Sequence, residues 1–250
     1  MSKKFTYYGG IQAGLLPYLT AYWTADNIAT DVHVNNLGGA WNATSHYATG
    51  INGEAFDFQN NNTIRYVAVP DNDLLSFTDG TNDVPFTINM WTYFYSFSSI
   101  GNWLINRRDT NSTPNAEFQL TYSASNSTIA FNKFSQSVSS NRVETLSSIA
   151  PSLNTWEMWT LTSDGSKFGE KIYRNGVDVT GVAAEIGTYV KMNNTNSSTK
   201  FAQAGFLSAD QRAKHRGMID ELAIFNGTEL TQLQIQDLYN GGVGKFYPNI

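Results

Sequence analysis

The acidic residues of this sequence are not spaced for glycoside cleavage. Enzymes that cleave glycosides with retention use two carboxyl groups about 5 Å apart. On one face of a strand such groups would alternate, as in Glu-x-Asp-x-x-Glu, and the sequence contains no run of that kind. Asp71 and Asp73 lie in a predicted loop, whereas Asp220 and Glu221 are adjacent, so their side chains should point to opposite faces of a strand. The carboxylates therefore predict a protein that is not an enzyme.

Other catalytic and phosphate-binding patterns are also missing from the sequence. The three histidines, His33, His46 and His215, stand in no pattern typical of a nucleophile-activating base or a metal site. There is no cysteine, which excludes disulfides and thiolate metal ligands. The pairs Gly38-Gly39 and Gly241-Gly242 read as turn glycines, because neither forms a strand–loop–helix phosphate cradle.

Aromatic side chains beside planar hydrogen-bonding groups are the strongest candidates for ligand recognition. The chain has 13 Tyr, 15 Phe and 6 Trp, and such rings can stack on the faces of sugars. The predicted ligand-binding residues are Trp41 and Tyr47 in an early loop region, with Trp103 and Arg107 near a strand end. The alternative at each position is a side chain that belongs to the core or to a sheet face.

Charge and hydropathy exclude two classes of partner. Charged residues make up only 15% of the chain and the formal net charge is −5. A nucleic-acid-binding domain carries a basic patch, and the only basic clusters are Arg107-Arg108 and residues 212–216, so no nucleic-acid partner is expected. No stretch approaches the roughly 20 apolar residues of a membrane span, so no membrane insertion is expected.

Short strands separated by polar turns must position these side chains. The longest strand is predicted over residues 86–95, which are rich in β-branched and aromatic residues. Asn175-Gly176 lies between alternating residues and predicts a tight hairpin, because a type I′ turn needs positive φ at both positions. One short helix should begin after Thr231, since Gln234 completes a capping box, and should end near Gly241-Gly242.

The chain is predicted to divide into an N-terminal arm, residues 1–20, and one domain, residues 21–250. The arm combines several aromatic and aliphatic residues with helix-breaking glycines and Pro17. It is too apolar for a solvated tail, so it must be buried against something. We expect another chain to order it, with folding back onto its own domain as the alternative.

Five motifs in order resemble the laminin-G-like, concanavalin A-like jelly-roll family, over about residues 20–245. Each is short, but their order and the closing strand–helix pair are specific. They are Gly50-Ile51-Asn52-Gly53-Glu54-Ala55-Phe56-Asp57-Phe58, Pro85-Phe86-Thr87-Ile88-Asn89-Met90-Trp91, Asn154-Thr155-Trp156 with Ile172-Tyr173-Arg174-Asn175-Gly176, Gly217-Met218-Ile219-Asp220-Glu221-Leu222-Ala223-Ile224-Phe225-Asn226, and Leu230-Thr231-Gln232-Leu233-Gln234-Ile235.

The resemblance implies an all-β fold of two antiparallel sheets packed face to face in a jelly-roll sandwich, with one short C-terminal helix. It also implies a structural Ca²⁺, with Asp220 of the closing strand as one ligand. Early ligands in the family come from the turn after the first strand, where Asp26 and Asp31 stand. The predicted metal ligands are therefore Asp220 and Asp26, and the alternative for Asp220 is a purely structural role.

The predicted function is structural or binding, and not catalytic. Members of the family occur in phage virion and bacterial surface proteins. Because the chain lacks cysteine and a signal-peptide-like segment, we expect a homo-oligomeric virion surface, decoration or fibre component. Its expected partners are other virion or surface subunits, and a cell-surface glycan. The alternative is a carbohydrate-binding, lectin-like module of a bacterial secreted or glycan-processing protein.

Overall fold

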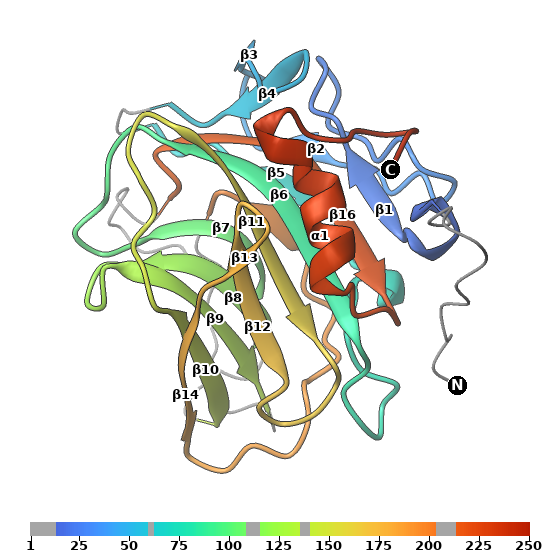
Figure 1. The fold of residues 1–250 in the computed structure, drawn as a ribbon, viewed down its shortest axis with the longest axis vertical. Coiled ribbons are helices and arrows are strands. Elements are labelled where there is room, and N and C mark those ends of the chain that lie inside the picture. The colour runs from blue at the N-terminus through green and yellow to red at the C-terminus, as the bar shows by residue number, and fades with distance from the viewer. Residues whose placement is uncertain (1–13, 60–62, 109–115, 136–140, 204–213) are drawn as a thin grey trace.

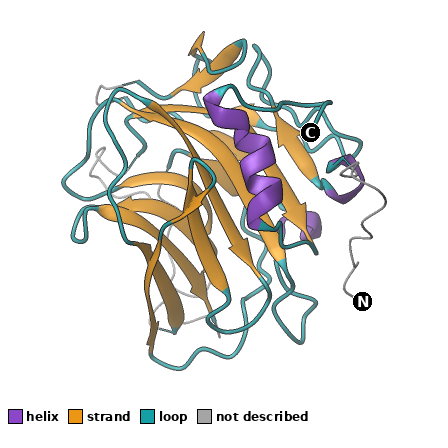
Figure 2. Cartoon of the chain, viewed as in Figure 1, coloured by secondary structure: helices purple, strands orange, loops and turns teal. Residues whose placement is uncertain are grey.

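The structure is a computed structural model that describes residues 14–59, 63–108, 116–135, 141–203 and 214–250. Strands dominate it, and one α-helix lies near the C-terminus (Figures 1 and 2). The strands form two antiparallel sheets of eight strands each. The predicted all-β sandwich with one short C-terminal helix is confirmed.

One sheet has the helix on its outer face and is called the helix-covered sheet. Its strand order is β13-β12-β11-β6-β16-β4-β3, and β1 also pairs with β16. The strands are β1 (Ala21–Trp23), β3 (Tyr47–Thr49), β4 (Glu54–Asp57), β6 (Phe86–Phe94), β11 (Trp156–Ser163), β12 (Glu170–Arg174), β13 (Val177–Asp178) and β16 (Gly217–Asn226).

The second sheet is called the open sheet, because no described helix covers its outer face. Its order is β14-β10-β9-β8-β7-β15-β5-β2. The strands are β2 (Ala40–Trp41), β5 (Val67–Val69), β7 (Asn102–Arg108), β8 (Ala116–Ser123), β9 (Thr128–Phe134), β10 (Arg142–Ser147), β14 (Thr180–Ile186) and β15 (Thr199–Phe201).

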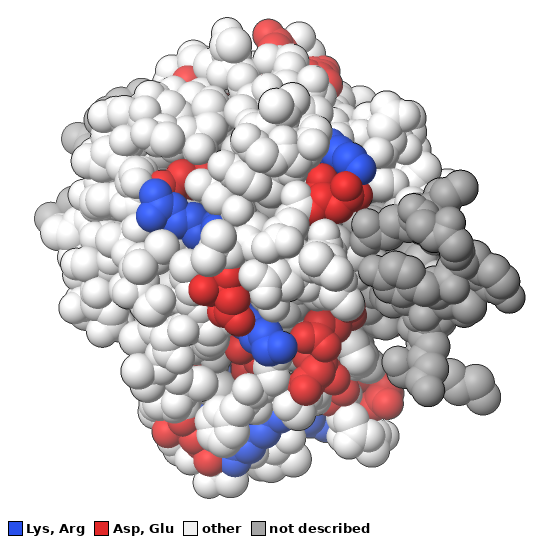
Figure 3. All heavy atoms as spheres, in the orientation of Figure 1, with Lys and Arg blue, Asp and Glu red and all other residues white. Residues whose placement is uncertain are grey.

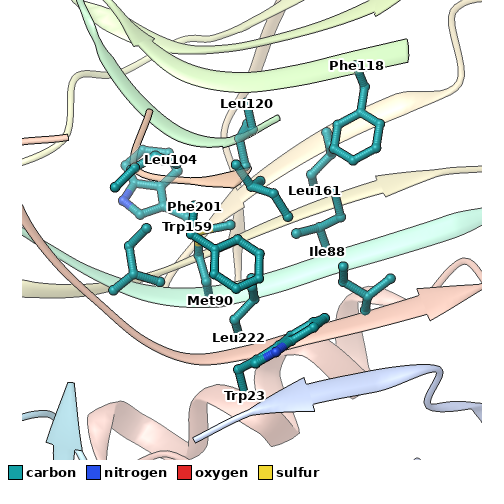
Figure 4. Close-up of a cluster of buried hydrophobic side chains, with 14 of the residues drawn as sticks. Trp23, Ile88, Met90, Leu104, Phe118, Leu120, Trp159, Leu161, Phe201 and Leu222 are labelled. Atoms are coloured by element: carbon teal, nitrogen blue, oxygen red, sulfur yellow. The ribbon is translucent and has the colours of Figure 1, made fainter. Parts of the chain in front are cut away.

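The main core fills the space between the two sheets. Along β6, alternate residues from Phe86 to Met90 point inward and are fully buried, because successive side chains of a strand face opposite ways. The open sheet contributes Phe118 and Leu120 in the same way. Figure 4 shows the resulting contacts between the sheets, with Trp23, Ile88, Met90, Trp159, Leu161 and Leu222 on one side and Leu104, Phe118, Leu120 and Phe201 on the other.

A second apolar cluster covers the outer face of the helix-covered sheet. Helix α1 (Gln232–Tyr239) buries Ile235 and Leu238 against outward-facing sheet residues such as Trp91 and Met158. The ring of Tyr239 stacks on Trp91, with centroids 5.8 Å apart. The outward residues of this sheet are apolar, so covering them removes their surface from water. Figure 3 shows the same face with charged side chains in small separate groups on a largely uncharged surface.

The turn and cap predictions are confirmed. Asn175 and Gly176 have φ values of 53° and 77°, as the type I′ hairpin between β12 and β13 requires. Thr231 caps α1 by accepting from the backbone N–H of Gln234, and the Gln234 side chain accepts from the backbone N–H of Thr231. The left-handed stop falls one residue earlier than predicted, at Asn240, before the 3₁₀ turn η3 (Asn240–Gly242).

The N-terminal arm differs from its prediction where it is described. Residues 14–20 include the 3₁₀ turn η1 (Leu16–Tyr18), and Leu15 and Leu19 pack into the second apolar cluster of their own domain. The Leu15 N–H also donates to the carbonyl of Ile250 at 3.0 Å. The expectation that another chain orders the arm is therefore wrong for residues 14–20, because the apolar outer face of the helix-covered sheet already buries Leu15 and Leu19. Residues 1–13 lie outside the described residues.

Two further findings complete the fold. A third 3₁₀ turn, η2 (Asp73–Leu75), is capped by the Asn72 side chain, which accepts from the Leu74 N–H at 2.9 Å. None of the described helices is both long enough and apolar enough to span a bilayer.

Candidate ligand-binding face

A row of polar side chains crosses the outer face of the open sheet. Strand pairing places Lys200 opposite Asn106, Asn106 opposite Gln119, Gln119 opposite Asn132, and Asn132 opposite Glu144. Residues paired in register point to the same face of a sheet. Five strands, β15, β7, β8, β9 and β10, thus each contribute one polar group to a continuous polar row.

A hollow of about 410 Å³ lies over the part of this row formed by Gln119, Asn132 and Glu144. Its volume falls within the range of about 300–1,000 Å³ that is usual for small-molecule sites. The lining combines one large aromatic residue, amides, hydroxyls and one carboxylic acid. The lining residues are Ser99, Ile100, Trp103, Gln119, Thr121, Tyr122, Ser123, Ala124, Ser125, Ala130, Asn132 and Glu144.

Two amide oxygens of the polar row have no hydrogen-bond partner among the described residues. They are Oδ1 of Asn106 and Oε1 of Gln119, which stand opposite each other on β7 and β8. The Nδ2 of Asn106 donates to the carbonyl of Gln203, so its amide is anchored at one end. An unpaired polar group away from water costs free energy, and such groups in a native protein call for an explanation. Both oxygens are themselves buried, so they lie beneath the more exposed groups of the row.

Trp103 reaches the hollow because of a bulge and a glycine. The register of β7 against β8 shifts between Trp103 and Ile105, so Trp103 faces outward opposite Thr121 while Leu104 enters the core. Gly101 has φ of 105°, and a β-carbon there would lie 2.7 Å from a backbone oxygen and 3.5 Å from the indole. A larger residue at Gly101 would therefore disturb the wall on which the indole rests.

The other two predicted aromatic contacts lie elsewhere. Trp41 donates its indole N–H to the Tyr47 hydroxyl at 3.1 Å, and their rings meet edge to face. The Trp41 ring also packs against Phe56 and Phe58 of the main core. This aromatic pair joins the edge strands β2 and β3 of the two sheets and lies outside the hollow, so the structure brings Trp103 alone of the predicted aromatics to the candidate face.

Arg107 occupies an inward position that solvent does not reach. Its side chain is 0% exposed, its Nε lies 3.0 Å from Glu117, and its Nη2 lies 2.6 Å from Asp71. Burial raises the pKa of Glu117, while the Arg107 charge acts in the opposite direction. The sequence suggested a ligand contact because Arg107 stands near a strand end, but the structure gives this residue a structural role.

The two predicted metal ligands are found on opposite sides of one tight turn, residues 50–54. Oδ2 of Asp220 accepts the backbone N–H groups of Ile51 and Asn52, at 2.9 and 3.3 Å. Oδ1 of Asp26 accepts the backbone N–H of Glu54 at 2.8 Å. The structure thus brings Asp220 and Asp26 to the same turn, and each holds part of its backbone.

Glu221 adds a second buried carboxylate beside Asp220. Residues 220–223 form a bulge in β16, and Glu221 adopts φ of 51° within it. Burial, and then the neighbouring Glu221 charge, raises the pKa of Asp220 to about 8. Burial also raises the pKa of Glu221 to about 7, and the Asp26 charge adds to this rise. The turn therefore carries more negative charge than the surrounding protein neutralises.

The residues at this turn fit a calcium ion in chemistry but do not form a ready-made site. Among the described residues, the buried Oε2 atoms of Glu221 and Glu54 accept no hydrogen bond of ordinary geometry, and carboxylate oxygens suit Ca²⁺. However, the described part of the chain holds no group of three or more His, Cys, Asp or Glu residues placed to bind a metal. An ion here would need backbone carbonyls and water as well as Asp220, Glu221 and Asp26.

Sequence reasoning missed most of the candidate face. Gln119, Asn132 and Glu144 lie on β8, β9 and β10, and no sequence motif marks these residues. The available signal was the alternation of β8 and β9, where Gln119 and Asn132 interrupt apolar core positions. Alternation indicates that such residues face outward, but it does not say which strands become neighbours.

Comparison with known proteins identifies both a family and a set of solved structures of similar fold. A family model described as the concanavalin A-like lectin/glucanases superfamily matches residues 60–236. No curated protein sequence matches the chain.

Three solved structures illustrate the likeness in fold. The binding domain of Paraclostridial Mosquitocidal Protein 1 has a TM-score of 0.67 and 16% identity, over 92% of this chain and 53% of that one. The binding domain of botulinum neurotoxin DC, in complex with rat synaptotagmin II, has a TM-score of 0.65 and 15% identity, over 91% and 52%. Domain 4 of AbnA, an extracellular GH43 arabinanase from Geobacillus stearothermophilus, in complex with arabinotriose, has a TM-score of 0.57 and 18% identity, over 91% and 98%. This chain spans about half the length of the two toxin chains.

Proposed function

The chain belongs to the concanavalin A-like lectin/glucanases superfamily, and from that premise we propose that it is a non-catalytic module that binds glycans on its open sheet. The observation that carries the proposal is the hollow over the open sheet, whose lining brings the Trp103 ring together with the polar side chains of Gln119, Asn132 and Glu144. A sugar offers many hydroxyl donors, so it can satisfy several fixed acceptors at once.

The lining of the hollow suits a sugar in two further ways. Trp103 supplies a flat apolar surface at one side, on which the C–H face of a pyranose or furanose ring can lie. Asn132 and Glu144 supply planar polar groups at the other side. A sugar ring likewise has an apolar face and a polar edge, so the hollow and the ligand are complementary.

The same lining argues against hydrolysis. Glu144 is the one carboxylic acid among the described residues that line the hollow. Glycoside cleavage normally needs a second carboxyl group, as nucleophile or as base. The proposal is therefore for binding without turnover.

Related folds give the proposal independent support. Domain 4 of AbnA, which this chain covers along nearly its whole length, was solved in complex with arabinotriose. A domain of this architecture can thus hold a short oligosaccharide. The identity of 18% carries no information on which sugar this chain would hold.

The experiment compares Trp103→Ala with Phe168→Ala. Both variants remove an aromatic ring, but Phe168 is a 52% exposed residue of a turn remote from the hollow lining. Binding to an oligosaccharide array is measured first, and isothermal titration then gives affinities for the hits. We expect Trp103→Ala to weaken binding about tenfold or more and Phe168→Ala to leave it unchanged. Equal affinities for the wild type and Trp103→Ala would refute the hollow as the site.

We further propose that the module acts on an exterior surface, as part of a virion or of a bacterial cell-surface or secreted assembly. Strand β14 supports the assembly part of this proposal. It lies at the free edge of the open sheet, and Val182 within it is 69% exposed. An exposed edge strand without proline or lysine is open to pairing with another subunit.

Light scattering coupled to size exclusion tests the assembly proposal. We expect an oligomer that Val182→Lys disperses, because a charge on an edge strand opposes pairing. A monomer at all concentrations would exclude homo-oligomers. Immunogold labelling of phage particles and of producing cells then separates the virion from the cell-surface and secreted alternatives.

A calcium ion at the turn of residues 50–54 is a separate proposal. Asp220, Glu221 and Asp26 would hold it, and the ion would neutralise their charge and fix the turn against β16. An ion that binds the folded state alone raises the melting temperature. We expect Ca²⁺ to raise it relative to a chelator at pH 7.5, and Glu221→Gln to abolish the difference. Identical melting curves with calcium and with chelator would leave Asp220 as a structural aspartate.

A further inference from the structure

Two arginine side chains, Arg108 and Arg142, lie beside the hollow on the outer face of the open sheet. Arg142 stands opposite Phe134 in the pairing of β10 with β9, and the Arg108 guanidinium lies 5.6 Å from the centre of the Phe134 ring. Phe134 itself is 3% exposed. The Phe134 ring thus lies under the Arg108 guanidinium, and Arg142 is its partner on the neighbouring strand.

Direct contacts connect this arginine pair to the polar row. The Nε of Arg142 donates to Oδ1 of Asn132 at 3.0 Å, and Asn132 lines the hollow. The Nζ of Lys200, which opens the polar row on β15, donates to the carbonyl of Arg108 at 3.3 Å. A ligand that contacts Asn132 in the hollow would therefore lie close to Arg142, because the two side chains are hydrogen-bonded to each other.

The local charge is opposite to that of the whole chain. The formal net charge of the protein is −5. On the outward face formed by the described parts of β15, β7, β8, β9 and β10, the basic residues Arg108, Arg142 and Lys200 stand against the single acid Glu144. A cluster of charges of one sign raises the local concentration of ligands of the other sign.

The two guanidinium groups also lie close enough to repel each other. Burial lowers the pKa of Arg108, and the charge of Arg142 lowers it further. An anion bound between the two guanidinium groups would reduce that repulsion, and its hydrogen bonds would replace the water that burial removes from Arg108. Planar guanidinium groups match carboxylate and sulfate oxygens especially well, because they donate two parallel hydrogen bonds.

We propose that the hollow and the Arg108–Arg142 pair form one extended site, which selects glycans that carry an anionic group beside the sugar in the hollow. This inference rests on the proposed glycan-binding function and narrows its ligand class to acidic sugars. Trp103 and the polar row hold the ring, and the arginine pair holds the carboxylate or sulfate. Glu144 stands two residues from Arg142 on β10, so it disfavours a second anionic group in the hollow itself.

Nucleic acid fits this face less well than an acidic glycan. A strand of nucleic acid needs basic groups repeated along a groove together with several stacking rings. Here the described basic groups Arg108 and Arg142 lie beside the hollow without lining it, and Glu144 does line it. A polyanion that stacks no sugar ring on Trp103 would contact only the arginine pair.

The experiment uses the full chain and a panel of oligosaccharides with matched backbones. Each backbone is immobilised in a neutral, a uronate and a sulfated form, and single-stranded DNA is included as a polyphosphate. Arg142→Gln is compared with the wild type. The matched control is Lys171→Gln, which removes one positive charge at an exposed position on β12 of the helix-covered sheet.

We expect the wild type and Lys171→Gln to bind an anionic form about tenfold or more tightly than its neutral counterpart, since hydrogen bonds to charged groups are the strong ones. In Arg142→Gln that ratio should fall towards one. The uronate and sulfate arms identify which anion is recognised. Thermal melting of each variant confirms that it is folded.

The other outcomes contradict the inference in distinguishable ways. Equal binding of neutral and anionic forms, or a ratio that Arg142→Gln does not change, overturns the arginine pair as a specificity determinant but leaves the hollow as a glycan site. Binding to DNA as tight as to any glycan replaces the inference with general polyanion binding. Failure of every saccharide in the panel removes the proposed function and this inference with it.

Discussion

The outer faces of the two sheets differ in what their strands present. On the helix-covered sheet, the outward residues include Trp91, Met158 and Phe225, and α1 and the chain termini bury them. On the open sheet, the corresponding positions include Gln119 and Asn132, and a hollow lies over them. Both sheets present mainly apolar residues to the shared core. The two sheets therefore differ chiefly in the residues whose side chains point away from it.

This contrast indicates where stability and recognition reside. Covering the apolar outward residues removes their surface from water and stabilises the folded state, so that face contributes to stability. Polar outward residues such as Gln119, Asn132 and Glu144 gain little free energy from being covered, so the hollow over them stays available to a ligand. Changes on the first face should therefore alter stability, and changes on the second should alter binding.

The largest expected loss of stability comes from weakening the packing of α1 on the helix-covered sheet. Ile235 of α1 is 0% exposed, and Ile235→Ala should lower the free energy of unfolding by about 2–5 kcal/mol because it leaves a cavity. Urea denaturation measures the change. Leu233→Ala, at a 62% exposed position of the same helix, is the control and should stay within about 0.5 kcal/mol. Similar losses for both variants would show that the helix is not held by its buried face.

A pH dependence should arise from the helix-covered sheet. The folded pKa values of Asp220 and Glu221, about 8 and about 7, lie above the ordinary carboxyl value of about 4. The folded state therefore binds protons more tightly than the unfolded state between pH 4 and pH 8. Their contribution is complete at the acidic end of this range and is lost as the pH rises, by an amount on the order of several kcal/mol.

Thermal melting from pH 5 to pH 8, with a chelator present, measures this slope. Glu221→Gln should flatten it, because the variant removes one buried charge and the repulsion that raises the pKa of Asp220. Glutamine can still accept the hydrogen bond that the Asn52 side chain donates at 2.8 Å. An unchanged slope in Glu221→Gln would assign the pH dependence to other groups.

The helix cap should have a moderate effect. Thr231→Ala removes the hydroxyl that caps α1 and should cost about 1 kcal/mol of unfolding free energy. Thr231→Ser keeps the hydroxyl and should restore most of that stability. Chemical denaturation of the two variants decides between capping and simple packing, because a loss shared by Ser and Ala would point to the missing methyl group.

The smallest effect on stability should come from the open sheet. Gln119→Ala removes an amide whose oxygen has no hydrogen-bond partner, so the free energy of unfolding should change by less than about 0.5 kcal/mol. Glycan affinity should nevertheless fall, since the row loses one acceptor. A stability loss comparable with that of Ile235→Ala would remove the contrast between the two faces.

Much of the fold could be predicted from local signals. The Asn175-Gly176 hairpin follows from the φ values that those residues tolerate, and the start of α1 follows from Thr231 and Gln234. The long strand of residues 86–94 follows from its β-branched and aromatic composition. Each of these features depends on residues that are close in the sequence.

The candidate site depended on contacts between distant residues. Trp103 was predicted as a ligand contact and does line the hollow, whereas Arg107, four residues later, is buried with Glu117. The bulge beside Leu104 sets which of these residues face outward, and nothing in the local sequence specifies it. The arginine pair likewise depends on the pairing of β9 with β10 and on the position of Arg108 over Phe134.

The sequence by itself determined the class of fold, the turns, the cap and the absence of disulfides, because composition and short-range geometry control these features. The tertiary structure alone decided which outward faces are covered, which carboxylates share the turn of residues 50–54, and which polar groups form the row. Those outcomes depend on strand register and on packing between segments more than 100 residues apart, such as Ile51 and Asp220. A period-two pattern shows that a residue can face outward, and only the neighbours that folding brings beside it decide what that residue does.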